Sequence, residues 1–417
     1  MYPDWPSSAA DLVPLPQCFG PKLRPFDFQG PQSIDFLEFL GEGLHSFVFK
    51  VEILGRIYAL KLFRFEYVWG WDGIPNDFDR SDITALTTIY NYSEPFNREC
   101  RSFGRLQEAG YEELAVQCFG YLLLDQEHER AMRAKFSNMR HVRLEFDGNS
   151  ECPGYEDVRG SFPGRSGRPP PIRGIVKEFG LGVEELKTRD MKRLFRTMTQ
   201  LQQLGIINLD VGDRQLIGGK ICDFSTAITV PHPVTTPELN PHLYLESESL
   251  HVLQLGTFLL CMNDYWTFDD MVRLWNEEHE DQKTEISARA YPSGYGCRFD
   301  YNLRNTPSRA RVYTFVDPRK YDWKACTGTP APDAARTRHG PQTRQRTKSR
   351  AQATSTRGVS KTRPRLDKRP PRWYLDCDPR LAAGLKEETE CIHPVQWHAK
   401  NGLIYPRMRE KLSRWMR

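Results

Sequence analysis

Two aspartates, Asp210 and Asp223, are the first candidates for chemistry in this sequence. Each follows a short apolar run within the stretch LGIINLDVGDRQLIGGKICDFSTA, residues 204–227. Between them, Gly218 and Gly219 predict the tight turn of a β-hairpin. Carboxylates held at strand ends can accept a proton or bind a metal ion. Aspartate is also common in ordinary turns, so this stretch alone fits either a site or two turns.

A second group of candidates lies on a predicted β-hairpin nearer the N-terminus. Apolar and polar residues alternate through 47–53, and another strand is expected at 57–63. The sequence GEGLHS, residues 41–46, directly precedes the first strand of the hairpin. Its glycines would let backbone N–H groups approach phosphate oxygens. Ala59 and Lys61 share one face of the second strand. An ordinary turn and a solvent-exposed lysine are the alternatives.

A helix with one apolar stripe is predicted to follow this hairpin. Ser93 is a suitable N-cap, with Pro95 in the first helical turn. Apolar residues recur at helical spacing at Phe96, Cys100, Phe103 and Leu106. Glu99 lies beside that stripe. It is either a residue at the rim of the core or the partner of Lys61 in an ion pair.

The remaining regular segments alternate with long polar stretches. Strands are expected at 114–124 and 172–179, a long amphipathic helix at 189–203, and helical patterns at 250–262 and 268–278.

Composition bounds the kinds of protein that this chain can be. It has 417 residues, of which 39% are hydrophobic and 12% aromatic, as expected for a globular protein. The ten cysteines include no CxxC pair, and the N-terminus carries no apolar signal segment. Reduced thiols in the cytosol or nucleus are therefore expected. No apolar run is long enough to cross a bilayer, so no membrane association is predicted.

One segment carries most of the positive charge. Residues 331–372 hold 13 lysines and arginines against Asp333 and Asp367. Such a segment could make weak electrostatic contact with nucleic acid, act as a nuclear import signal around 361–365 and 368–369, or be a solvated linker. It lacks interleaved aromatic residues, which argues against base stacking.

The order of these motifs resembles that of the protein-kinase fold. Its glycine-rich loop, GxGxxGxV, has serine here in place of the third glycine, and the matching positions are Gly41, Gly43, Ser46 and Val48. Ala59 and Lys61 resemble the Ala-x-Lys that grips the α- and β-phosphates, and Glu99 resembles the helix partner of that lysine. Glu178 stands where a kinase offers backbone groups to adenine.

The same resemblance implies specific roles for residues of the stretch 204–227. Asp210 is similar to the catalytic-loop aspartate that accepts the proton of a substrate hydroxyl. Asp223, followed by Phe224 and Ser225, looks like the metal-binding Asp-Phe-Gly. Gln215 stands where an asparagine would hold a second metal ion. The resemblance thus implies ATP and Mg²⁺ as cofactors.

Departures from the kinase pattern cluster around the catalytic loop. Asn208 and Leu209 replace the usual His and Arg, and no Ala-Pro-Glu follows Ser225. We therefore expect a pseudokinase that binds nucleotide and acts as a scaffold. The alternative is an active, atypical Mg-ATP phosphotransferase that uses Lys61, Asp210 and Asp223.

Three segments, 93–110, 201–232 and 395–411, resemble the fungal kinetochore Sim-four complex subunit Fta-two family more closely. This resemblance implies a fungal protein with a kinase-like body and with kinetochore or chromatin proteins as partners. It also implies a nuclear location at the kinetochore or centromere, with the cytoplasm as the alternative.

The expected fold is α+β, a bilobal kinase-like fold with a small antiparallel-sheet N-lobe and a reduced helical C-lobe. The expected parts are an irregular arm at 1–32, the N-lobe at 33–124, a polar, largely disordered insertion at 125–173, the C-lobe at 174–327, a disordered basic linker at 328–372 and a C-terminal segment at 373–417 that packs back on the body.

Overall fold

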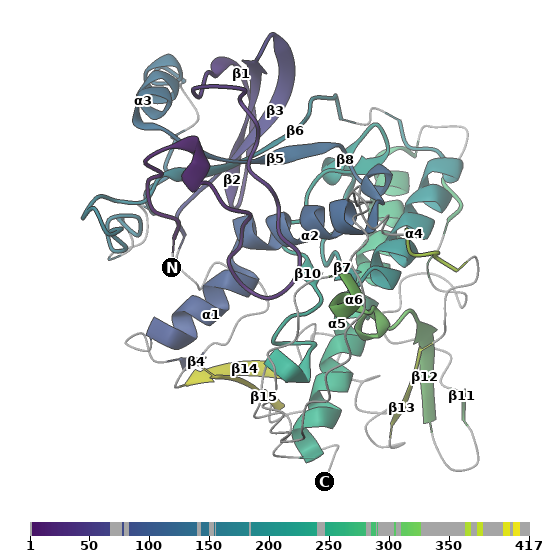
Figure 1. Ribbon diagram of the computed structural model, residues 1–417. Coiled ribbons are helices and arrows are strands. Elements are labelled where there is room, and N and C mark those ends of the chain that lie inside the picture. The colour runs from purple at the N-terminus through teal and green to yellow at the C-terminus, as the bar shows by residue number, and fades with distance from the viewer. Residues whose placement is uncertain are drawn as a thin grey trace, which may run out of the picture.

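In the computed structural model of this chain, a five-stranded antiparallel sheet is the largest sheet among the described residues (Figure 1). Its strands, in spatial order, are β1 (Asp35–Gly43), β2 (Ser46–Ile53), β3 (Arg56–Phe63), β6 (Ile172–Glu178) and β5 (Cys118–Leu124). The structure describes residues 2–66, 77–78, 83–139, 143–149, 154, 156–182, 185–239, 247–280, 285–288, 290, 304–305, 310–326, 363–367, 373–377, 395–400 and 403–408.

The alternation seen in the sequence produces the predicted hairpin. Phe47, Phe49 and Val51 of β2 are fully buried on one face, as the period-two pattern requires. The pattern did not predict the full extent of β1, which pairs with β2 over residues 35–43. β1 is an edge strand and most of its side chains are at least partly exposed, so it carries little apolar periodicity.

Six α-helices accompany the sheet in the described part of the chain. They are α1 (Ile83–Ser93), α2 (Pro95–Ala109), α3 (Gln126–Lys135), α4 (Thr188–Gln203), α5 (Ser247–Glu278) and α6 (Trp323–Cys326). The cap of α2 is Glu94 rather than the predicted Ser93, because the Glu94 carboxylate accepts a hydrogen bond from the Asn97 backbone N–H at 3.0 Å. The two helical patterns at 250–262 and 268–278 form the single helix α5.

Part of the polar stretch at 125–173 is ordered against the sheet. Asp125 caps α3 by accepting a hydrogen bond from the His128 N–H at 2.8 Å. Phe136 and Phe146, which follow α3, pack their rings on Phe49 and Phe47 of β2, respectively. These apolar residues are too widely spaced to show a period, and for that reason the sequence predicted a polar, largely disordered insertion and not the helix α3.

Four smaller sheets complete the described strands. They pair β7 (Ile206–Ile207) with β10 (Ile228–Thr229), β8 (Leu216–Ile217) with β9 (Lys220–Ile221), β12 (Ala310–Phe315) with β11 (Arg304–Asn305) and β13 (Trp373–Cys377), and β14 (Val395–Lys400) with β15 (Leu403–Met408) and β4 (Asp77–Phe78). The β8–β9 hairpin is the one predicted from Gly218 and Gly219. Strands from the C-terminal segment thus pair with strands from earlier in the chain.

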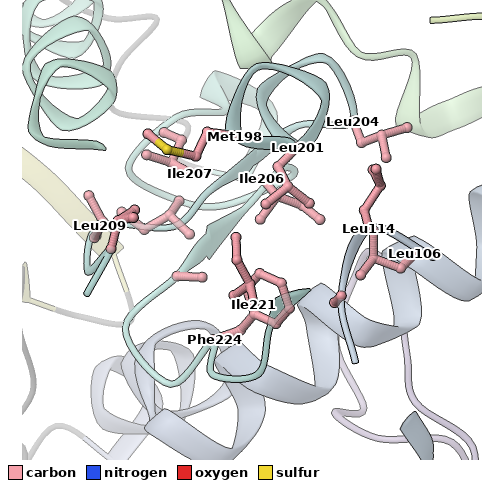
Figure 2. Close-up of a cluster of buried hydrophobic side chains, with 14 of the residues drawn as sticks. Leu106, Leu114, Met198, Leu201, Leu204, Ile206, Ile207, Leu209, Ile221 and Phe224 are labelled. Atoms are coloured by element: carbon pink, nitrogen blue, oxygen red, sulfur yellow. The ribbon is translucent and has the colours of Figure 1, made fainter. Parts of the chain in front are cut away.

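The stretch that holds both aspartates lies on the main hydrophobic core (Figure 2). Ile206, Ile207, Ile221 and Phe224 gather there with side chains of α4, and Leu106 of α2 and Leu114 of the 3-10 helix η3 (Glu112–Leu114) join them. Burial of the residues beside Asp210 and Asp223 fixes the backbone at both positions. Among the described residues, no helix combines the length and apolar character that a membrane span requires.

Candidate functional site

Lys61, Glu99 and Asp223 meet between the sheet and α2. The Nζ atom of Lys61, on β3, lies 2.8 Å from Oε2 of Glu99 on α2 and 2.7 Å from Oδ1 of Asp223. Asp223 follows β9, and its Oδ1 also accepts a hydrogen bond from the Ser225 N–H at 2.8 Å. The structure therefore contains the Lys61–Glu99 ion pair that was one of two interpretations of Glu99 in the sequence.

A second lysine, Lys177 on β6, binds the same glutamate. Its ammonium donates a hydrogen bond to Oε1 of Glu99 and another, at 2.7 Å, to the carbonyl of Cys222. Lys177 pairs with Ala59 across the sheet, and Ala59 lies on the same face of β3 as Lys61. The two lysines therefore lie on one face of the sheet, with the small Ala59 side chain beside both. Glu99 is fully buried, and each of its two carboxylate oxygens has an ammonium partner.

These contacts set the charge of the site. Burial alone would lower the pKa of Lys61, but the charges of Asp223 and Glu99, with hydrogen bonds to both, raise that pKa above its ordinary value. Burial would raise the pKa of Asp223, and the charges of Lys61 and Lys177 outweigh it, so that pKa lies well below the usual carboxyl range. Both groups are thus ionised at neutral pH.

Asp210 lies in a separate cluster of polar contacts. Arg214 donates to both of its carboxylate oxygens, at 2.9 and 2.7 Å, and the Gln215 amide donates to Oδ2 at 2.5 Å. Gln215 belongs to the 3-10 helix η4 (Asp213–Gln215), and its backbone carbonyl accepts a hydrogen bond from the Cys222 N–H at 2.9 Å. Asp210 and Asp223 are therefore linked through Gln215 and the base of the β8–β9 hairpin.

The backbone leading to Asp210 is fixed by a buried carboxylate on α5. Asp264 accepts hydrogen bonds from the N–H groups of Asn208, at 3.2 Å, and Leu209, at 2.6 Å. Leu209 has φ +68°, a left-handed conformation that a leucine rarely adopts without such support. Burial raises the pKa of Asp264 to about 6, and its hydrogen bonds limit that rise.

Three buried arginines of α2 hold the segment after Asp223. Arg98, Arg101 and Arg105 lie at i, i+3 and i+7, so they project from one face of the helix. Their guanidinium groups donate to backbone carbonyls of residues 226–231, including that of Thr226 at 3.0 Å and that of Val230 at 2.6 Å. Movement of this segment would thus disturb α2 and Glu99 together.

The remaining predicted site residues lie on the same sheet as Lys61. Apart from backbone pairing between strands, no contact between them and Lys61 is described. Gly41 and Gly43 end β1, Ser46 begins β2, and Val48 pairs with Lys61. Glu178 is exposed at the end of β6, where it lines a cavity of 480 Å³ with Tyr58, Phe119 and Phe179, among others. The glycine-rich turn and Glu178 remain predictions as parts of a binding site.

The comparisons with known proteins point to one family. A family model described as kinetochore Sim4 complex subunit FTA2 matches residues 12–228, which is more than half of the chain. The chain belongs to this family. Membership in the FTA2 family implies a role as a kinetochore Sim4 complex subunit, with other kinetochore proteins as partners and a nuclear, centromeric location. No curated protein matches the chain.

The FTA2 match contains every residue of the two polar clusters around Lys61 and Asp210. Asp264, which supports the loop before Asp210, lies beyond the matched range. Sequence inspection missed Lys177, Arg214 and Asp264. The position of Lys177 after Ile175 and Val176, inside the predicted strand 172–179, was a signal for it, because a charge in a buried strand needs a partner. Arg214 and Asp264 carried no such signal.

Proposed function

We propose that this FTA2-family chain binds a nucleotide on a bilobal, kinase-like body and acts as a scaffold in its kinetochore complex, without transferring phosphate. The contrast between its two aspartates carries the proposal. The described hydrogen bonds of Asp223, from Lys61 and Ser225, both go to its Oδ1, whereas both carboxylate oxygens of Asp210 accept hydrogen bonds, from Arg214 and Gln215. One carboxylate is thus placed for binding, and the other has few free acceptor positions.

Lys61 is the group best placed to bind phosphate. Its side chain is only 6% exposed and already bonds two carboxylates, so it is held in one position before any ligand arrives. Lys177 binds the second oxygen of Glu99, so Glu99 stays paired when the Lys61 ammonium turns toward a phosphate. A phosphate oxygen could then share the Lys61 ammonium with Asp223.

Asp223 and Gln215 offer oxygen ligands of the kind that a magnesium ion takes. Oε1 of Gln215 is buried and has no hydrogen-bond partner in the described part of the structure, and an amide oxygen is a suitable Mg²⁺ ligand. Asp223 would supply a carboxylate oxygen, and nucleotide phosphates and water would complete the shell, as is usual for Mg²⁺. A bound ion would neutralise phosphate charge beside Lys61.

The contacts of Asp210 favour a scaffold. A general base must accept a proton from a hydroxyl at hydrogen-bond distance. Both oxygens of Asp210 already accept hydrogen bonds from Arg214, and Oδ2 accepts another from Gln215. A substrate hydroxyl would have to displace one of these donors.

An active phosphotransferase is the second candidate, and one observation favours it. The Asp210 side chain is 32% exposed and Arg214 is 67% exposed, so the arginine could move aside. Asp264 would keep the preceding backbone in place during that movement. In this alternative Asp210 takes the hydroxyl proton and Lys61 orients the phosphates.

Calorimetric titration with Mg-ATP tests nucleotide binding. The wild-type chain should bind, Lys61→Met and Asp223→Asn should bind about tenfold or more weakly, and Asp210→Ala should match the wild type. Absence of any binding by a folded wild-type chain would remove the nucleotide proposal.

An ATP-turnover assay on the same proteins separates the scaffold from the enzyme. We expect equal, background rates for the wild type and Asp210→Ala. A wild-type rate clearly above that of Asp210→Ala would establish the phosphotransferase instead.

A further inference from the structure

A short basic segment from the second half of the chain lies against the turn after α2 and the end of α4. Of residues 327–372 the structure describes 363–367, with the sequence Arg-Pro-Arg-Leu-Asp. The segment contacts Tyr111 and Glu113, next to the end of α2, and Gln203, the last residue of α4. More than 150 residues separate it from each of these partners.

Arg363 makes two contacts of different kinds. Its guanidinium carbon lies 3.6 Å from the centre of the Tyr111 ring, which is the geometry of a cation–π interaction. The same guanidinium forms an ion pair with the Glu113 carboxylate. An aromatic face and a carboxylate together select a planar cation, and arginine fits them better than lysine does.

The residues after Arg363 add directional contacts. The Tyr111 hydroxyl donates a hydrogen bond to the Pro364 carbonyl at 2.6 Å, and the Asp367 N–H donates to Oε1 of Gln203 at 2.9 Å. Leu366 is half-buried and packs against the main hydrophobic core. Arg365 points to solvent and has an exposed side chain.

We propose that Tyr111, Glu113 and Gln203 form a docking site whose ligand is the chain's own segment Arg363–Asp367. The site recognises the pattern Arg-x-x-Leu: it binds the Arg363 guanidinium and the Leu366 side chain, and the Tyr111 hydroxyl adds a hydrogen bond to the backbone carbonyl of residue 364. Docking fastens the C-terminal side of the basic stretch that begins at residue 331 to the body. The proposal does not depend on nucleotide binding, because none of these residues contacts Lys61 or Asp223.

Trypsin cleavage after Arg365 reports directly on docking. The Arg365–Leu366 bond is protected while Leu366 is packed, and proteolysis follows the undocked population. Glu113→Arg removes the ion pair and repels Arg363, so cleavage at this bond in the full-length chain should become roughly 3- to 30-fold faster. Glu112→Arg is the matched control, because Glu112 lies on the same 3-10 helix and has no described contact with the segment. Its cleavage rate should stay near that of the wild type.

Charge exchange and amide exchange complete the test. Arg363→Glu alone should be cleaved faster than the wild type because it loses both the ion pair and the cation–π contact. The double variant Glu113→Arg with Arg363→Glu should be cleaved more slowly than Arg363→Glu alone, since the ion pair is restored in reverse. Gln203→Ala should speed hydrogen exchange at the Asp367 N–H and leave the melting temperature unchanged. Equal cleavage of the wild type, Glu113→Arg, Arg363→Glu and the double variant, or no change in exchange at Asp367, would overturn the proposal.

Discussion

Lys177 binds the carboxylate oxygen of Glu99 that Lys61 leaves unused. The two ammonium groups come from different strands, β6 and β3, and Glu99 is fully buried between them. A buried carboxylate that lost every cation would be strongly destabilising. With two lysines, loss of either one still leaves Glu99 paired.

Single lysine variants should therefore fold, and the double variant should be much less stable than either. We expect Lys61→Met and Lys177→Met each to lower the free energy of unfolding by about 1–3 kcal/mol, the usual range for a hydrogen bond to a charged group. The double variant should lose more than the sum of the two, because Glu99 is then buried without a cation. Urea denaturation of the four proteins measures this coupling, and additive losses would argue against a shared role.

Acid should weaken the Lys61–Asp223 contact only below the usual carboxyl range. The pKa of Asp223 is lower in the folded than in the unfolded chain, so its stabilising effect is complete above the unfolded pKa and is lost as pH falls toward the folded pKa. As the pH falls from about 4 to about 2, the wild type should thus lose more stability than Asp223→Asn, which has no carboxylate at this position to protonate. Parallel stability curves for the two proteins would contradict this assignment.

Arg101 should be among the most sensitive residues of α2. It is fully buried, and its guanidinium donates to the backbone carbonyls of Phe19, at 2.8 Å, Thr229, at 3.1 Å, and Pro231. Arg101→Ala should cost roughly 2–4 kcal/mol, because buried carbonyls lose their donor. Arg101→Lys should recover little, since an ammonium cannot span carbonyls placed for a planar fork. Arg130→Ala, on the exposed face of α3, is the control and should change the melting temperature by less than about 1 °C.

Gly104→Ala should destabilise the protein, although glycine-to-alanine substitution stabilises most helices. Alanine usually stabilises a helix relative to glycine by about 1 kcal/mol. At Gly104, however, an added Cβ would lie 2.6 Å from backbone atoms of Lys22 in the N-terminal arm. We expect Gly104→Ala to lower the melting temperature and to increase amide exchange in residues 15–26. A more stable variant with an unchanged arm would show that the arm does not pack there.

The sequence determined the local structure wherever an apolar period was strong. Alternation in 47–53 and 57–63 predicted β2 and β3, and helical spacing in 189–203 predicted α4, because burial of one face requires such a period. The glycine pair at 218–219 likewise predicted the hairpin between the two aspartates. Edge strand β1 and the packing of Phe146 lacked such a period and could not be predicted in this way.

Tertiary structure alone decided which charges meet. The two aspartates of one stretch, Asp210 and Asp223, have opposite surroundings because Arg214 bonds one and Lys61 the other. The partners of Glu99 come from strands 38 and 78 residues away in the chain, a separation over which no sequence spacing applies. Long-range contacts of this kind depend on how the sheet packs on α2. In the same way, the contact between Arg363 and Tyr111 depends on the tertiary packing of the segment 363–367.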